Sequence, residues 1–164
     1  NRRGHDHRRP KRTLRRRLLI MADKNEITAQ LAGASAEQWQ SLEELVVAFE
    51  TGTVQLNTVH PPETAANGVI SLGWTEHGDE LGRLHELVYE MGVVTDCDWV
   101  SWYDPDRYPD VDSLQGAAPV DLIRLATAIF RSDRFSEGVI VEYIENGMLV
   151  AVLRQLVDDQ QLRT

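Results

Sequence analysis

The stretch that decides the fold is Phe130-Arg-Ser-Asp-Arg-Phe-Ser-Glu-Gly138, which places two arginines, an aspartate and a glutamate between two apolar helical segments. Before it, apolar residues follow the i, i+3, i+4, i+7, i+8 spacing of a buried helix face, and Pro119 suits a first helical position. After it, apolar residues recur at helical spacing in residues 136–146, which Asn146-Gly147 ends, and again in residues 148–156. Three helices joined by tight corners predict a compact helical unit.

Two more helices are expected upstream. Ser35 and Gln38 have the spacing of a capping box at the start of an amphipathic segment that Thr51-Gly52 ends. Residues 79–91 carry a second apolar stripe, with Gly92 just past its end.

The region between these helices has a weaker pattern, and residues 53–74 allow short strands around the Pro61-Pro62 and Asn67-Gly68 turns. Residues 96–104 fit either a strand or a short helix capped by Asp98, and we favour the helix. The predicted fold class is therefore mainly α: a compact single-domain helical bundle, with a small two-stranded β element allowed near residues 53–74.

The predicted organisation is a disordered basic leader at residues 1–20, a flexible segment at 21–34, one helical domain at 35–157 and a tail at 158–164. The leader holds eight arginines and one lysine against a single aspartate, a net charge of +8, and lacks a hydrophobic face that could dock on a core. Met21-Ala-Asp-Lys is typical of a translation start, so we interpret the leader as upstream sequence. The alternative is a genuine basic arm that binds nucleic acid.

The rest of the chain is strongly acidic, since residues 21–164 have a net charge of −17. Such a surface repels phosphate backbones, so nucleic acid is not expected as a partner except through the leader. No apolar run has the length of a signal-peptide core or of a membrane span, and the single cysteine, Cys97, cannot form an internal disulfide. A cytoplasmic protein without a membrane partner is expected.

The charged corner offers the only catalytic candidates: Arg131 and Arg134 as clamps for an anion, with Glu137 as acid or base. The structural alternative is favoured, in which these side chains pair with carboxylates and brace the corner between two helices. Gly138 is expected there because a position without a side chain allows two helices to approach closely.

The residues of this corner also resemble the C-terminal hallmark of a bacterial and phage family, domain of unknown function 6508. The resemblance rests on Arg131, Asp133-Arg134-Phe135, Glu137-Gly138, Glu145, Gly147 and the closing leucines, and extends more loosely over residues 68–156. It implies a domain but no activity, because that family has no established function.

Trp99, Trp102 and Tyr103 form a dense aromatic group, which predicts either core packing or a contact for a protein partner, with Trp99 and Trp102 as the binding residues. The aspartates of residues 104–112 lack the pattern of a calcium loop, and no metal-ligand, phosphate-loop or nucleophile motif is present, so neither metal nor cofactor is expected. We expect Cys97 to be inert.

The favoured function is a small acidic binding or regulatory module that acts through protein-protein contacts, and a non-catalytic role is favoured over an enzyme. One alternative is an enzyme or anion-binding site that uses Arg131, Arg134 and Glu137. A second alternative is nucleic-acid binding through residues 1–20.

Overall fold

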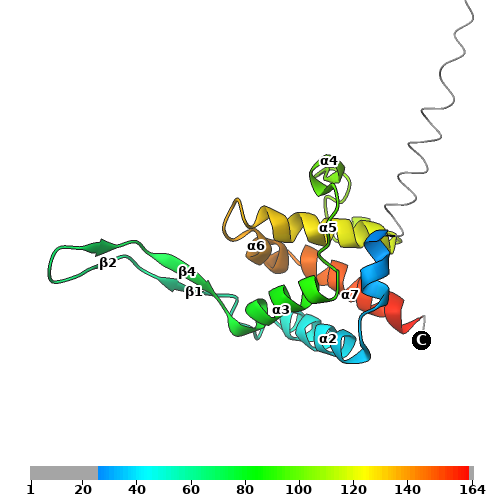
Figure 1. Ribbon diagram of the computed structural model, residues 1–164, viewed down its shortest axis with the longest axis horizontal. Coiled ribbons are helices and arrows are strands. Elements are labelled where there is room, and N and C mark those ends of the chain that lie inside the picture. The colour runs from blue at the N-terminus through cyan, green and yellow to red at the C-terminus, as the bar shows by residue number, and fades with distance from the viewer. Residues whose placement is uncertain (1–25, 163–164) are drawn as a thin grey trace, which may run out of the picture.

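A computed structural model describes residues 26–162, so the expectations for residues 1–20 lie outside the described part. Residues 26–32 are helical. The further helices are α2 (Ala36–Glu50), α3 (Asp79–Glu90), α4 (Trp99–Trp102), α5 (Pro119–Ser132), α6 (Val139–Glu145) and α7 (Met148–Gln161), with a 3₁₀ turn η1 (Asp112–Leu114). The strands are β1 (Asn57–His60), β2 (Glu63–Thr64), β3 (Ile70–Ser71) and β4 (Trp74–His77). The predicted mainly helical single domain with a small β element is confirmed (Figure 1).

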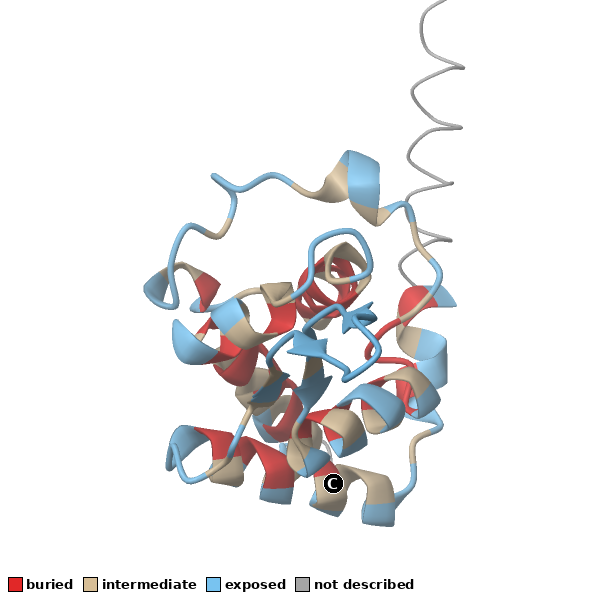
Figure 2. Ribbon diagram, turned by 90° about the vertical axis from the view of Figure 1, so that its left-hand side faces the viewer, coloured by how far each residue is buried: buried red, intermediate tan, exposed pale blue. Residues whose placement is uncertain are grey.

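The core of the helical body is built around α7, which packs against α2, α5 and α6. The periodic stripes that predicted the helices are buried in it, and the inner faces of the helices carry the buried residues in Figure 2. The best example is α5, whose stripe of Leu122, Leu125, Ala126, Ile129 and Phe130 is at most 4% exposed. Burial of these stripes against one another, rather than helix propensity, holds the short helices in place.

The predicted helix ends are confirmed where a cap specifies them. The N–H of Gln38 donates to Ser35 Oγ at 3.2 Å, and the N–H of Ser35 donates to Gln38 Oε1 at 2.9 Å, so α2 begins with a complete capping box. Asp98 caps α4 by accepting a hydrogen bond from the Ser101 N–H at 3.2 Å, which confirms the helix at the ambiguous aromatic segment. Pro119 occupies the first turn of α5.

Other boundaries differ from the expected ones. The flexible segment expected at residues 21–34 is helical at 26–32, where Ile27 and Leu31 are buried in the core. The helix expected at 136–146 begins only at Val139, because residues 133–138 form the corner itself. The last helix runs through Gln161, so the described part of the expected tail continues α7.

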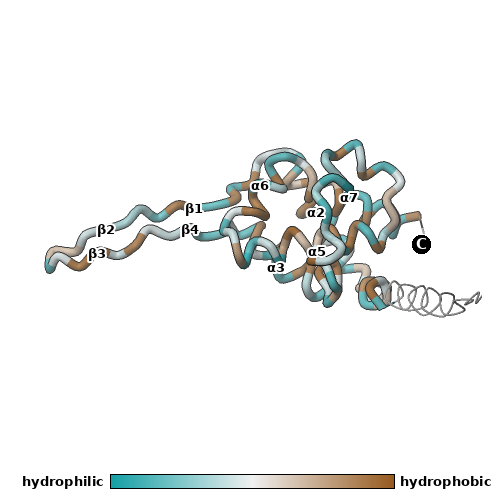
Figure 3. The backbone as a smooth tube through the Cα atoms, turned by 90° about the horizontal axis from the view of Figure 1, so that it is seen from above, coloured by the Kyte–Doolittle hydropathy of each residue, from teal (hydrophilic) through white to brown (hydrophobic). Residues whose placement is uncertain are grey.

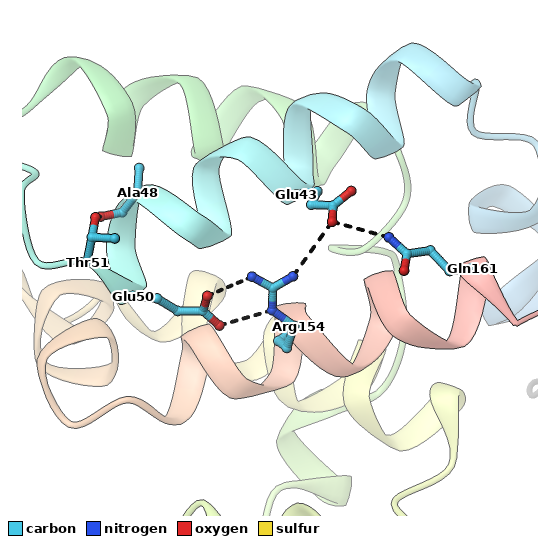
Figure 4. Close-up of polar contacts among 6 residues, drawn as sticks. All are labelled: Glu43, Ala48, Glu50, Thr51, Arg154 and Gln161. Atoms are coloured by element: carbon cyan, nitrogen blue, oxygen red, sulfur yellow. Dashed lines mark hydrogen bonds and ion pairs between the residues drawn. The ribbon is translucent and has the colours of Figure 1, made fainter.

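An ion pair that joins distant parts of the sequence fastens α2 to α7 (Figure 4). Arg154 donates from Nε to Glu50 Oε1 at 3.0 Å and from Nη2 to Glu50 Oε2 at 2.7 Å, and its Nη1 lies 4.0 Å from Glu43 Oε1. The hydrogen bond with Arg154 lowers the pKa of Glu50 and raises the pKa of Arg154, with burial opposing both shifts. Since the side chains of Glu43 and Glu50 are 43% and 41% exposed, water screens the pair, and it contributes at most about 1 kcal/mol.

The β element is a single long hairpin that projects from the body, here called the β-arm (residues 57–77; Figures 1 and 3). β1 pairs antiparallel with β4 at the base, and β2 pairs antiparallel with β3 nearer the tip. The strands pack mainly on their hairpin partners and not on the helices. The sequence predicted a β element in this region, but not its projection from the body.

Local interactions shape the β-arm. At the tip, Asn67-Gly68 closes a tight turn in which Gly68 has a φ of 80°. At the outer end of the β1–β4 ladder, the rings of His60 and Trp74 stack with centroids 4.0 Å apart, and His60 Nε2 lies 3.1 Å from Glu76 Oε2. Between these regions the strands approach so closely that a Cβ on Gly73 would lie 2.9 Å from the His60 carbonyl oxygen, which explains a glycine there.

Candidate functional site

The charged corner between α5 and α6 is organised by Asp133, which follows the last residue of α5. Its Oδ1 accepts hydrogen bonds from the backbone N–H groups of Gly138 and Ile140, both at 3.1 Å. Gly138 has a φ of 94°, and a Cβ at that position would meet nothing within 4 Å. The expectation that Gly138 allows close helix approach is therefore wrong: glycine is favoured by the left-handed backbone that leads into α6.

Arg131 braces the segment that follows α3. Its Nη2 donates to the Thr95 carbonyl at 3.3 Å and lies 3.9 Å from Asp96 Oδ1, while Nε is buried without a hydrogen-bond partner in the described residues. The Thr95 N–H in turn donates to the Thr127 hydroxyl of α5 at 3.2 Å. These contacts tie the loop after α3 to α5.

The other two catalytic candidates lie on the exposed part of the corner. Arg134 and Glu137 are exposed, and within residues 26–162 neither side chain forms a hydrogen bond or an ion pair. Phe135 between them is 84% exposed. The three candidates therefore lie near one another along the chain, but no hydrogen bond or ion pair joins any two of them.

The predicted binding residues Trp99 and Trp102 both lie on α4, which packs against α5. Trp102 packs against the core, with the Arg107 Cζ 4.6 Å and the Arg124 Cζ 6.0 Å from its ring centroid. Trp99 is half-buried. Trp102 therefore packs between the core and two arginine side chains. This arrangement favours core packing over a contact for a protein partner.

Beside α4, a cavity of about 220 Å³ is lined by polar and aromatic side chains, among them Trp102, Tyr103, Tyr108 and Tyr143. The hydroxyls of Tyr103 and Tyr143 share a hydrogen bond of 2.9 Å. Burial, followed by the hydrogen bond with Tyr103, raises the pKa of Tyr143 to about 12. The Tyr143 hydroxyl is therefore harder to deprotonate than that of an ordinary tyrosine.

Aspartate side chains in residues 104–112 accept hydrogen bonds from backbone N–H groups of the same loop. Asp104 Oδ1 accepts from the Asp106 N–H at 3.1 Å, and Asp110 Oδ1 accepts from the Ser113 N–H at 2.9 Å. No group of three or more His, Cys, Asp or Glu side chains within residues 26–162 is arranged to hold a metal ion. Cys97 is half-buried, and its carbonyl accepts a hydrogen bond from the Trp99 N–H at 2.8 Å.

The β-arm is the most exposed apolar feature of the described residues. Five of the ten large hydrophobic residues that are exposed lie on it: Val59 (73%), Val69 (60%), Ile70 (65%), Leu72 (85%) and Trp74 (55%). Ile70, Leu72 and Trp74 occupy alternate positions, which point to one side of an extended chain; we call these three residues the apolar stripe. Clustered exposed apolar side chains mark contact sites more often than scattered ones.

The sequence predicted short strands in residues 53–74 but did not indicate that their apolar side chains are exposed. A signal was nevertheless present, since residues 57–77 contain Pro61-Pro62, Gly73 and the Asn67-Gly68 turn, which interrupt the alternation of a buried strand. The polar partners across the ladder, such as Thr64 opposite Ile70, also fit an exposed hairpin.

Within residues 26–162, no helix has the length and apolar character needed to cross a membrane. Comparison with curated proteins and with solved structures found no match. Residues 34–160 match the family of unknown function DUF6508, a longer stretch than residues 68–156, where the resemblance was seen in the sequence. The match covers nearly all of the helical body and the β-arm, and the chain belongs to this family of unknown function.

Proposed function

We propose that the protein is a non-catalytic binding module that acts through protein-protein contacts, and that the β-arm is its contact surface. The observation that carries the proposal is the exposure of the apolar stripe on a hairpin that projects from the helical body. The proposal includes a cytoplasmic location, because the single cysteine, Cys97, cannot form an internal disulfide.

The energetics of the hairpin support a binding role. An isolated two-stranded hairpin is marginally stable in water, and one that exposes Leu72 at 85% gains little from burying its own side chains. Covering one such side chain contributes about 1.5–3 kcal/mol. A partner that covers the apolar stripe therefore stabilises both the complex and the conformation of the β-arm.

The charged residues of the β-arm favour a protein over a nucleic acid as its partner. Residues 57–77 contain Glu63 and Glu76 but neither lysine nor arginine, so the β-arm lacks the permanently charged side chains that bind a phosphate backbone. The anion-site alternative has weaker support, because Arg131 is already held by the Thr95 carbonyl and lies 3.9 Å from Asp96 Oδ1, while Arg134 and Glu137 are exposed. A protein surface with apolar side chains is the partner that this arm fits.

The test is a chain with a shortened β-arm. His60 and Trp74 face each other in the ladder, so replacing residues 61–73 with Asn-Gly joins them through a two-residue turn and keeps both the base of the hairpin and its ring stack. The melting temperature should stay within about 2 °C of the parent, because the removed side chains are exposed.

Affinity capture from the cells that naturally express the chain then compares the two proteins. A specific protein that copurifies with the full chain should be lost with the shortened one. Equal capture by both chains would refute the β-arm as the contact surface.

A further inference from the structure

We propose that the β-arm joins two copies of this chain, with the apolar stripe of one arm packed on the stripe of the other. The proposal rests on the protein-binding role proposed above and names the partner. It follows from the charge, the reach and the apolar area of the arm.

Charge is the first argument. Residues 21–164 carry a net charge of −17, so the bodies of two copies repel each other wherever they come close. Over residues 57–77 the only acidic side chains are Glu63 and Glu76, and Glu76 lies 3.1 Å from His60 Nε2. Two arms can therefore meet with little repulsion, and the apolar stripe is a surface that complements itself.

Reach is the second argument. About ten residues separate the base of the β-arm from its tip, which corresponds to about 33 Å of extended strand. Charges in physiological salt are screened over about 8 Å. Two arms that lie alongside each other, tip toward base, keep the acidic bodies several screening lengths apart, and such a contact closes on itself with two-fold symmetry.

Area is the third argument. Ile70 is 65% exposed, Leu72 85% and Trp74 55%. Side chains of this size and exposure each present roughly 100 Å² of apolar surface, so the six side chains of two facing stripes present about 600 Å². Polar neighbours such as Thr64 extend this contact toward about 1,000 Å², the lower end of specific interfaces. A reversible dimer with a dissociation constant in the micromolar range is the expected result.

The test is sedimentation of the full chain between about 1 and 200 µM. The parent should pass from monomer to dimer over this range, with little dependence on salt because the contact is apolar. The double variant Ile70→Ser, Leu72→Ser should raise the dissociation constant at least 100-fold. The matched control Val100→Ser, Phe135→Ser removes apolar side chains of the same exposure, 68% and 84%, from the helical body and should dimerise like the parent.

Three outcomes overturn the proposal: a parent that stays monomeric over the whole range, a dimer that the arm variant leaves intact, or a dimer that the control variant weakens equally. The shortened β-arm distinguishes this failure from failure of the protein-binding role. If the parent is monomeric but the shortened chain no longer captures a protein that the parent captures, the proposed dimer is wrong and the protein-binding role stands. If shortening also leaves capture unchanged, both are wrong.

Discussion

Replacing Asp133 with alanine should destabilise the protein by about 2 kcal/mol. The substitution removes the carboxylate oxygen that accepts hydrogen bonds from the N–H groups of Gly138 and Ile140, both at 3.1 Å. Loss of a helix cap costs about 0.5–2 kcal/mol, and two hydrogen bonds to one charged, partly buried group place this substitution at the upper end. For the roughly 140 described residues, an unfolding entropy of about 2.1 cal/mol/K per residue converts the loss into a fall of about 7 °C in melting temperature.

Thermal unfolding followed by circular dichroism measures this change. Asp133→Asn keeps an oxygen acceptor and should lose less than about 1 kcal/mol. Arg134→Ala is the matched control on the same corner, and it should change stability by less than about 0.5 kcal/mol because Arg134 is exposed without an ion pair in the described residues. The account of the corner would be refuted if the melting temperature of Asp133→Ala fell by less than about 2 °C. It would also be refuted if Arg134→Ala lowered the melting temperature more than Asp133→Ala does.

Three further predictions concern the helical body. Phe130→Ala should cost about 3–5 kcal/mol in chemical denaturation, since Phe130 is 1% exposed, whereas the same change at Phe135, which is 84% exposed, should cost less than about 0.5 kcal/mol. The Tyr143 hydroxyl should ionise near pH 12 in an ultraviolet titration, whereas in the unfolded chain it ionises near pH 10. The contribution of Tyr143 to the free energy of unfolding should therefore fall as the pH rises from about 10 to about 12. Tyr143→Phe should remove this part of the pH dependence. Glu50→Gln should lower the free energy of unfolding by at most about 1 kcal/mol, and this loss should shrink in high salt. The loss should also shrink as the pH falls through the lowered pKa of Glu50, because protonation of the parent removes the same charge pair with Arg154.

The helical part of the fold could be predicted because its determinants are local. The capping box at Ser35, the proline at position 119 and the stripe that ends at Phe130 each specify an element from neighbouring residues alone. By contrast, the contact between Arg154 and Glu50 joins residues 104 positions apart, and nothing in the local pattern indicates which carboxylate the arginine meets.

The candidate surface could not be predicted because exposure is a tertiary property. Leu72 and Leu122 are both leucines in apolar surroundings, yet the first is 85% exposed on the β-arm and the second is fully buried in α5. At the charged corner, residue types suggested that Arg131 and Arg134 brace the turn by pairing with carboxylates. The corner is instead held by Asp133, because a carboxylate can accept two backbone N–H groups at once, a geometry that only the folded turn creates.

The most direct test of the β-arm as a contact surface is site-specific photocrosslinking in the cells that express the chain. A benzophenone amino acid at position 72, on the apolar stripe, is compared with the same amino acid at position 135, which is equally exposed on the helical body. We predict that position 72 forms a covalent adduct with one protein, a second copy of the chain by the further inference, and that position 135 does not. Adducts at position 135 alone, or none from position 72, would contradict the account.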